Sequence, residues 1–448
     1  MGQSIYRQFW RYTLPTVAAM LVNGLYQIVD GIFIGHYIGA DGLAGINLAW
    51  PIIGCVLGVS MMIGVGTGAL VSIKQGENNN AEAKKVLASG LMMVALLSPL
   101  ISLLLVEFGP SLIRSQGAQD HVYELATEYL GVLTYVSPLV LASFAMPFLL
   151  RNDNSPNLAT VLMVIGAIAN IVLDYIFIAL LDWELLGAAI ATSIAQSIVA
   201  LVGLAYFFSP YATLRLSLSD FGFDPAKLVN IVGTGASSLF MYAYASIMVA
   251  MHNWMFSIHG NLLVIGAYAI VGYIITVYYL TAEGIANGMQ PLVSYNYGAK
   301  RTDNIMKVLK MAMLSAVVGG ILFVTLLNVF PQASVAIFNA SDAQLQKYAV
   351  TGLRLHVFAI FLDGFIVVAA AYYQAVGLGR KATFVSLANI FVQFPFLFLL
   401  PKWLGVSGVW LAYPLSNIFL SIFVFVWLMK DIKRLTSQVP TQVVATSI

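Results

Sequence analysis

The sequence predicts an all-α membrane protein with twelve transmembrane helices in two six-helix lobes. Three observations support this fold class. Apolar residues make up 60% of the 448-residue chain and only 9% are charged, against about 25% charged in ordinary soluble domains. Twelve apolar runs are long enough to cross a bilayer, for which a helix needs about 20 residues. The second half of the chain also repeats landmarks of the first half at a nearly constant spacing.

The twelve apolar runs are separated by charged or turn-rich breaks. Each predicts a helix, because a transmembrane barrel would show short alternating strands instead of continuous apolar runs. The longest runs are expected to extend past the bilayer, tilt or kink. The runs cover residues 9–37, 44–73, 86–106, 123–150, 158–181, 186–208, 227–258, 262–293, 306–329, 345–376, 382–401 and 405–429.

Lys and Arg residues in the loops predict the orientation. If both termini lie on one side of the membrane, 17 of the 21 Lys and Arg residues fall on that side. Cytoplasmic loops of membrane proteins are enriched in these residues. We therefore expect both termini in the cytoplasm and a multi-pass protein of a bacterial or archaeal plasma (inner) membrane.

An internal repeat links the two halves of the chain. Pro110 matches Pro331 at an offset of 221 residues, and Ser72 matches Ser294 at an offset of 222. Six spans return the chain to its starting side, so both repeats enter the membrane in the same direction. Such repeats are related by an axis along the membrane normal, with the substrate path between them. The expected units are an N-lobe (residues 1–208), a polar cytoplasmic linker (209–226), a C-lobe (227–434) and a polar cytoplasmic tail (435–448).

Four of the 19 acidic residues fall inside predicted spans: Asp30, Asp174, Glu283 and Asp363. A charge at bilayer depth costs at least ~2.5 kcal/mol on the translocon scale. These four residues are therefore candidates for function.

Asp30 and Asp174 are expected to share a site in the N-lobe. Each lies seven residues from the outer end of its span, which places them at similar depth. Like charges in a low dielectric cannot both stay ionised unless something neutralises them, so the pair predicts a proton or cation site. The alternative is that each makes a separate structural hydrogen bond.

Polar residues on the same helix faces extend this prediction. Asn170 lies one turn before Asp174, and Thr192 and Gln196 share a face of the sixth span. At the repeat offset Asp30 falls on Met251, so the second lobe lacks this acid. The helix face of the first span that ends at Asp30 also carries Asn23, Tyr26 and Gln27.

The C-lobe has weaker candidates. Asp363 in the tenth span falls on apolar Leu141 in the first repeat, and it is a possible second acidic site. Glu283 lies nearer the cytoplasm, where it either lines an inner vestibule or makes a structural hydrogen bond. Tyr129, Tyr135 and Met251 are among the aromatic and methionine side chains that could line a cavity for apolar cations.

Composition excludes other functions. The single cysteine, Cys55, forms no intrachain disulfide, and the five histidines are scattered along the sequence. No metalloprotease, serine-hydrolase or phosphate-loop motif is present. A net charge of +2 gives no basic patch for nucleic acid. We therefore expect no enzyme activity, no cofactor and no nucleic-acid partner.

Several motifs together resemble the multidrug and toxic compound extrusion (MATE) transporters over nearly the whole chain. They are Leu14-Pro15, Asp30-Gly-Ile-Phe-Ile-Gly35, Asn170-Ile-Val-Leu-Asp174 and Tyr295-Asn-Tyr-Gly-Ala299. The resemblance implies export of small organic cations and drugs in exchange for inward H⁺ or Na⁺. The expected partners are these compounds and the lipid bilayer, and the expected state is a monomer.

The Asn and Asp of the fifth span are similar to the DinF-like branch of that family. In this branch the equivalents of Asp30, Asn170, Asp174 and Thr192 line the N-lobe site for a proton or Na⁺. A tyrosine of the fourth span also takes part, here Tyr129 or, as second choice, Tyr135. The proline equivalent to Pro15 is where the first span is proposed to bend.

The resemblance leaves two points open. Asp363 resembles a C-lobe acid of the NorM-like branch, but the seventh span has no acid, so that second site is incomplete. The rival function is a flippase for a lipid-linked oligosaccharide, which shares the broader fold. Such flippases carry several cationic residues in the central cavity, whereas no Lys or Arg is expected at a span centre here.

Overall fold

The computed structural model describes residues 4–116, 120–338 and 343–437, and these residues form helices and short connections. The first half of the chain forms α1 (Ile5–Phe33), α2 (Ala40–Gly76), α3 (Asn80–Ser115), α4 (Asp120–Tyr135), α5 (Ser137–Asn152), α6 (Pro156–Asp174) and α7 (Glu184–Phe208). The second half forms α8 (Pro225–His259), α9 (Leu262–Gly298), α10 (Thr302–Val329), α11 (Pro331–Ala336), α12 (Ala343–Val357), α13 (Ile360–Ala375), α14 (Gly379–Leu404) and α15 (Val406–Ser437).

The fold is that of an all-α membrane protein, as the composition predicts. In the described part of the chain, ten helices are long and apolar enough to cross a membrane on their own. Two further candidates are bent pairs: α4 with α5 at 72°, and α12 with α13 at 47°. The chain therefore has twelve spans when each bent pair counts as one, and the runs 123–150 and 345–376 are broken helices. Pro138 in the first turn of α5 accounts for the sharper break, because it cannot donate a backbone hydrogen bond.

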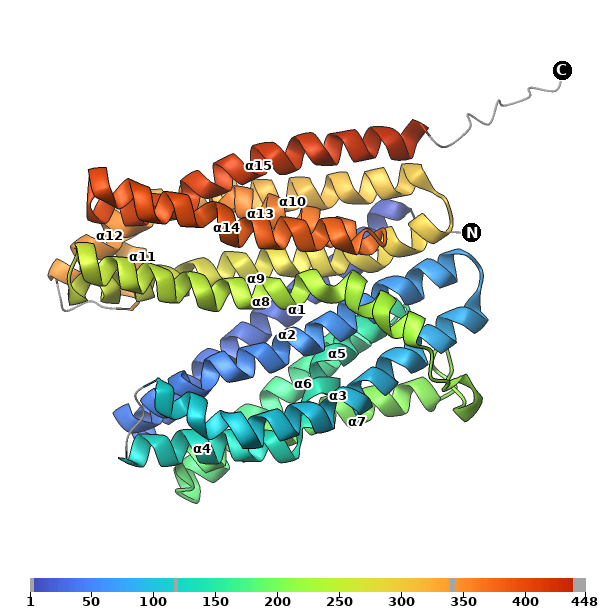
Figure 1. Cartoon of the computed structure of the whole chain (residues 1–448), viewed down its shortest axis with the longest axis horizontal. Helices are drawn as coiled ribbons and strands as arrows, with labels where there is room; N and C mark the ends of the chain where they lie inside the picture. The colour runs from blue at the N-terminus through green and yellow to red at the C-terminus, as the bar shows by residue number, and fades with distance from the viewer. Residues whose placement is uncertain (1–3, 117–119, 339–342, 438–448) are drawn as a thin grey trace.

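The helix boundaries follow the sequence repeat. The starts of α2, α3, α6 and α7 recur 222 or 223 residues later as the starts of α9, α10, α14 and α15. The two bends also lie at matching places, between α4 and α5 and between α12 and α13. Figure 1 shows the helices as two bundles, α1–α7 and α8–α15, which we call the N-lobe and the C-lobe.

The two lobes are closest at the end where α1 begins and α15 ends, and they diverge toward the other end (Figure 1). Glycines allow the close approach of α2 and α9 there. A β-carbon added at Gly76 would strike the backbone of Tyr295, and one added at Gly298 would strike the backbone of Ile73. Gly76 and Gly298 are 222 residues apart, so the repeat places matching glycines on the two crossing helices.

Buried amides add hydrogen bonds between the lobes at this closed end. The Asn152 side chain donates to Gln290 Oε1 (3.0 Å), and the Gln290 side chain donates to Asn152 Oδ1 (3.2 Å). The Ser72 hydroxyl also donates to Asn152 Oδ1 (2.6 Å). These contacts hold α5 of the N-lobe against α9 of the C-lobe.

The segment after α7 is more than a polar linker. Leu214 and Leu216 are buried against the N-lobe. The backbone N–H groups of Thr213 and Leu214 donate to the Asp153 carboxylate, each at 2.8 Å. The first part of the expected linker therefore packs as part of the N-lobe, because the buried Asp153 carboxylate needs these donors.

Candidate functional site

The N-lobe acids lie where two helices change geometry. Asp30 is in the last turn of α1, which continues as a π-helical turn from Ile34 to Ile38. Asp174 ends α6 and is followed by a second π-helical turn, Tyr175–Leu180. Such turns are rare and occur frequently at functional sites. In the C-lobe, the matching helices α8 and α14 continue without one through their described residues.

Buried oxygen atoms without hydrogen-bond partners define the site. Asp174 and Asn170 are almost fully buried, at 0% and 1% exposure. Neither carboxylate oxygen of Asp174 has a partner among the described residues, and Oδ1 of Asp30 and Oδ1 of Asn170 also have none. Four buried acceptors without donors are unusual, because buried polar groups are nearly always satisfied. The set suits a proton or a small hard cation, which prefers carboxylate and amide oxygens.

The residues around the two acids come from four helices. The Asp30 and Asp174 carboxyl groups lie close enough to influence each other electrostatically. The Asn170 amide donates to the Thr192 hydroxyl at 3.2 Å, which joins α6 to α7. Tyr129 of α4 is buried and faces Thr192 and Asp30. The structure thus brings together all five residues expected at the N-lobe site.

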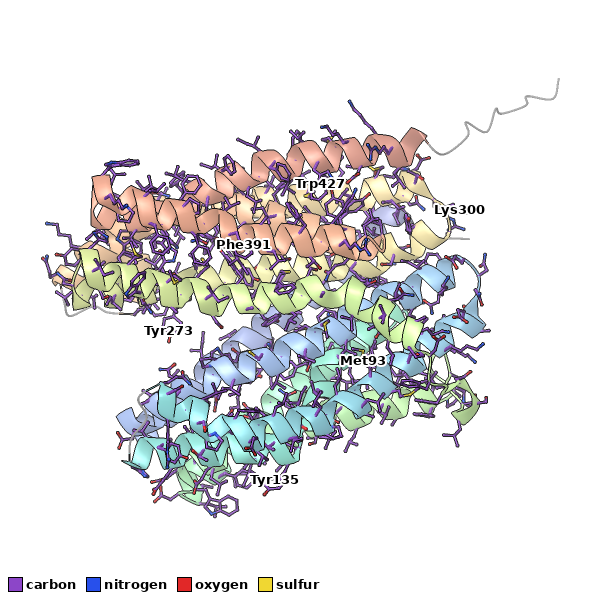
Figure 2. All side chains as sticks on the ribbon, viewed as in Figure 1. Met93, Tyr135, Tyr273, Lys300, Phe391 and Trp427 are labelled. Atoms are coloured by element: carbon purple, nitrogen blue, oxygen red, sulfur yellow. The ribbon has the colours of Figure 1, made fainter. Side chains whose placement is uncertain are left out.

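The second-choice tyrosine lies elsewhere. Tyr135 is 89% exposed at the end of α4, on the outer edge of the N-lobe (Figure 2). The expectation that it lines a cavity is wrong, because the break between α4 and α5 turns this position outward. Met251 packs against the buried core of the C-lobe and lines neither of the two cavities described below.

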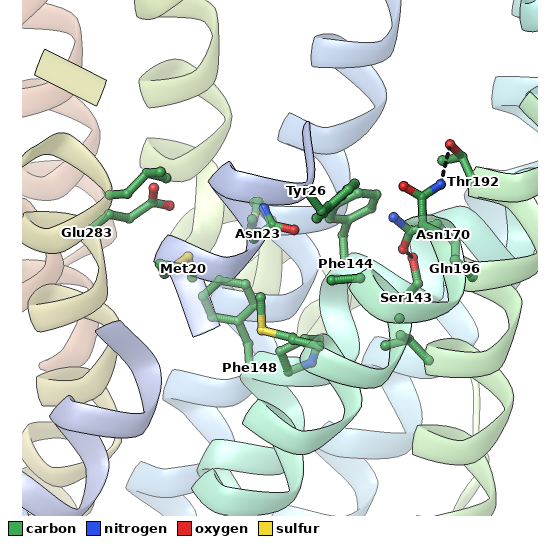
Figure 3. A pocket seen from close by; sticks show the side chains of 18 of the residues that line it. Met20, Asn23, Tyr26, Ser143, Phe144, Phe148, Asn170, Thr192, Gln196 and Glu283 are labelled. Atoms are coloured by element: carbon green, nitrogen blue, oxygen red, sulfur yellow. Dashed lines mark hydrogen bonds between the residues drawn. The ribbon is translucent and has the colours of Figure 1, made fainter. Parts of the chain in front are cut away.

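A cavity of about 690 Å³ lies beside the paired acids and reaches the C-lobe (Figure 3). Asn170 and Thr192 line one side, and Glu283 of α9 lies across the cavity from them. This volume includes space that is open to solvent. The expected lining residues Asn23, Tyr26 and Gln196 contribute to it.

A neighbouring cavity of about 720 Å³ is bordered by Asp30 itself. Gln27, Tyr129 and Gln196 line it together with apolar residues of α2 and α5. Tyr26, Thr192 and Gln196 border both cavities. Asp30 therefore borders one of two adjoining cavities that share lining residues.

The C-lobe acid occupies a smaller, separate cavity. Asp363 is 3% exposed and lies in the first turn of α13. With Asn389 and Ser386 it lines a space of about 330 Å³. Its Oδ1 atom has no hydrogen-bond partner among the described residues. No second acid lines this cavity.

Two features were missed by the sequence analysis. Arg151, which directly follows the apolar run 123–150, is 1% exposed at the end of α5, with its guanidinium over the Phe148 ring. His252 and His356, far apart in sequence, have ring centroids 5.5 Å apart in the C-lobe core. The burial of Arg151 and the meeting of the two histidines depend on how separate helices pack, so neither has a local sequence signal.

Comparison with known proteins decides the family. Residues 15–176 and 236–399, more than half of the chain, match the family model MatE. The chain belongs to the MatE family. This membership confirms the resemblance carried by the sequence motifs, and it means that the chain is not an enzyme.

Relatives of this MatE family member cover nearly its whole length. The multidrug export protein MepA of Staphylococcus saprophyticus is 25% identical over 437 residues, which are 97% of this chain and 95% of MepA. The outward-facing conformation of a multidrug resistance MATE family transporter of the MOP superfamily has a TM-score of 0.92 at 24% identity, with 97% of each chain covered. A MOP superfamily transporter from Pyrococcus furiosus, for which a binding pocket of reverse polarity suggests a different function, gives the same three values.

Proposed function

We propose that this MatE family member is a secondary active multidrug efflux antiporter that exports small organic cations in exchange for inward H⁺ or Na⁺. The observation that carries the proposal is the group of four unpartnered buried oxygens at Asp30, Asp174 and Asn170, beside a cavity lined by polar, aromatic and methionine side chains. The name of the staphylococcal relative, a multidrug export protein, supports the same function. No cofactor is needed.

The proposed mechanism begins with ion binding from the outside. A proton or Na⁺ at Asp30 and Asp174 neutralises the pair and changes the hydrogen bond between Asn170 and Thr192. Tyr129 adjusts with them because it faces Thr192. These changes reshape the cavity wall and expel the bound compound. By linkage, the compound must weaken ion binding as much as the ion weakens binding of the compound.

α1 is the element proposed to transmit the change. It is one continuous helix across Pro15 in this structure. The Thr160 hydroxyl donates to the Pro15 carbonyl at 2.9 Å, which ties α6 to this point. Proline removes one helix hydrogen bond and so lowers the cost of bending here. The proposal is that α1 bends near Pro15 after the acids are neutralised, and that the two lobes rock to alternate access.

The proposed location is a bacterial or archaeal plasma membrane, with both termini in the cytoplasm and the protein acting as a monomer. The lobes touch at the end where α1 begins and α15 ends. With this orientation the structure represents an outward-open state. The proposed units are the N-lobe (1–208), linker (209–226), C-lobe (227–434) and tail (435–448), with the first part of the linker packed on the N-lobe.

Arg151 is the observation that favours the flippase alternative, because flippases use cavity cations to bind pyrophosphate. It does not line the 690 Å³ cavity and lies behind Met163 and Phe148, which do. One cation behind an apolar wall is a poor match for a pyrophosphate, so the antiporter is the better function.

The test is dye efflux from proteoliposomes, with a pH gradient and a Na⁺ gradient imposed separately. Efflux driven by Na⁺ at zero pH gradient would assign the site to Na⁺, and efflux driven by the pH gradient alone would assign it to H⁺. Asp30→Asn and Asp174→Asn should abolish driven efflux, while Glu128→Gln, a change of an exposed acid on α4, should not. Normal efflux by the Asp30 and Asp174 variants, or no response of the wild type to either gradient, would contradict the proposal.

A further inference from the structure

The 690 Å³ cavity crosses from one lobe to the other. Sixteen of its nineteen lining residues come from the N-lobe, and Tyr242, Leu280 and Glu283 come from α8 and α9 of the C-lobe. Glu283 is the only charged side chain among the lining residues. The paired acids of the N-lobe do not line this cavity themselves, so its charge is set by the opposite lobe.

Glu283 has few partners of its own. It is 8% exposed, and its Oε1 atom accepts a long hydrogen bond from the Tyr242 hydroxyl at 3.3 Å. No Lys, Arg or His of the described residues lies within ion-pair distance of it. A buried carboxylate in this condition is costly unless a cation compensates it.

Arg151 is the nearby cation of the chain, but it does not pair with Glu283. The two side chains interact electrostatically, and they belong to different lobes. Nε and Nη1 of Arg151 have no hydrogen-bond partner among the described residues, and Nη2 contacts the Met163 sulfur at 3.5 Å. The guanidinium thus compensates the charge of Glu283 only in part, from behind the cavity wall.

The rest of the wall suits the apolar part of a ligand. Met20, Met61 and Met163 line it together with Phe144 and Phe148. Methionine side chains adapt to varied shapes, and aromatic faces attract organic cations. Figure 3 shows Met20, Phe144 and Phe148 of this wall between Glu283 on one side and Asn170 and Thr192 on the other.

We propose that Glu283 is the counter-ion for the charged centre of the exported compound. The ligand class is an amphiphilic organic monocation, with its charge held at Glu283 and Tyr242 and its apolar body among the methionines and aromatic rings of the N-lobe. This inference rests on the proposed efflux function and adds a specificity-determining residue in the lobe opposite the ion site.

A consequence is that the charge of the compound is bound at one end of the cavity, while H⁺ or Na⁺ binds near the other end. The compound reaches Asn170 and Thr192 through its apolar end, while its cationic end stays on α9. Removal of Glu283 should therefore lower affinity for cations but leave the response of the paired acids to H⁺ or Na⁺ intact. Arg151 repels a bound cation, so its removal should have the opposite effect on affinity.

The experiment is equilibrium binding to the purified full-length protein, with ethidium as the monocationic probe and Nile red as an uncharged aromatic probe. Glu283→Gln should weaken ethidium binding about 10- to 100-fold, the range for loss of a hydrogen-bonded charge partner, and should leave Nile red binding unchanged. Glu128→Gln is the matched control, because it makes the same substitution at an exposed site. Arg151→Met should tighten ethidium binding.

The outcomes separate the two proposals. Equal ethidium affinity of the wild type and Glu283→Gln would overturn the role of Glu283 while leaving the efflux function standing, and so would equal weakening of both probes. If Glu283→Gln does not fold, unchanged or weaker ethidium binding by Arg151→Met overturns it instead. Failure of the wild type to bind and export ethidium or any other cationic dye would overturn the proposed function itself.

Discussion

The contact between Asn152 and Gln290 should control how readily the closed end opens. Replacement of Gln290 by Met keeps the side chain similar in size and removes both hydrogen bonds to Asn152. Asn152 retains its bonds to the Phe148 carbonyl and the Ser72 hydroxyl, so the change leaves no orphaned amide there. The effect on opening is therefore the net value of two buried hydrogen bonds.

Each such bond contributes about 0.5–1.5 kcal/mol net, so two contribute about 1–3 kcal/mol. That corresponds to a shift of about 5- to 150-fold in the equilibrium between closed and open states of this end. The third bond of Gln290, to Ser294 at 2.9 Å, lies within α9 and affects stability without affecting the contact between lobes.

The assay is a distance measurement between spin labels at Asn79 and Arg301, which lie at the closed-end turns of the two lobes, in a variant without Cys55. Gln290→Met should add a population with a longer distance. The control is Gln374→Met, which removes a buried hydrogen bond to Ser238 within the C-lobe. A distance distribution that is unchanged in Gln290→Met, or equally changed in Gln374→Met, would refute the assignment of Asn152 and Gln290 as a contact that holds the lobes together.

Three further changes should act in stated directions. Gly298→Leu should push α2 and α9 apart and favour opening of the closed end, detectable with the same spin labels, whereas Gly319→Leu should not, because Gly319 faces open space. Tyr129→Phe should alter the ion dependence of efflux several-fold and Tyr135→Phe should not, since one faces the paired acids and the other is exposed; equal effects would remove Tyr129 from the site. Thr160→Val removes the hydrogen bond to the Pro15 carbonyl and should lower the melting temperature slightly, through loss of about 1 kcal/mol of folding stability. It should also change the efflux rate. An unchanged rate would argue against α1 as the moving element.

The sequence predicted those parts of the fold that depend on local pattern. Apolar runs located all twelve spans, because the bilayer requires continuous apolar helices. It did not locate the breaks inside two spans. The break before α5 had a signal in Pro138, whereas the break before α13 has no proline and no other local sequence signal.

The paired acids could be predicted to meet because both are charges at similar depth in one repeat. The sequence did not decide which other residues lie beside these acids. Tyr129 and Tyr135 are six residues apart, and the break after α4 decides that one faces Asp30 and the other faces outward. The burial of Arg151 beside Met163 and its relation to Glu283 of the other lobe depend on contacts between separate helices, which no pattern within one helix encodes.

The most direct test of the account is the affinity of the purified protein for a cationic dye, measured as pH and Na⁺ are varied. If ion and compound oppose each other through Asp30 and Asp174, wild-type affinity should fall as pH is lowered or as Na⁺ is raised, and Asp174→Asn should show neither dependence. A wild-type affinity independent of both ions, or an ion dependence that persists in Asp174→Asn, would contradict the central claim.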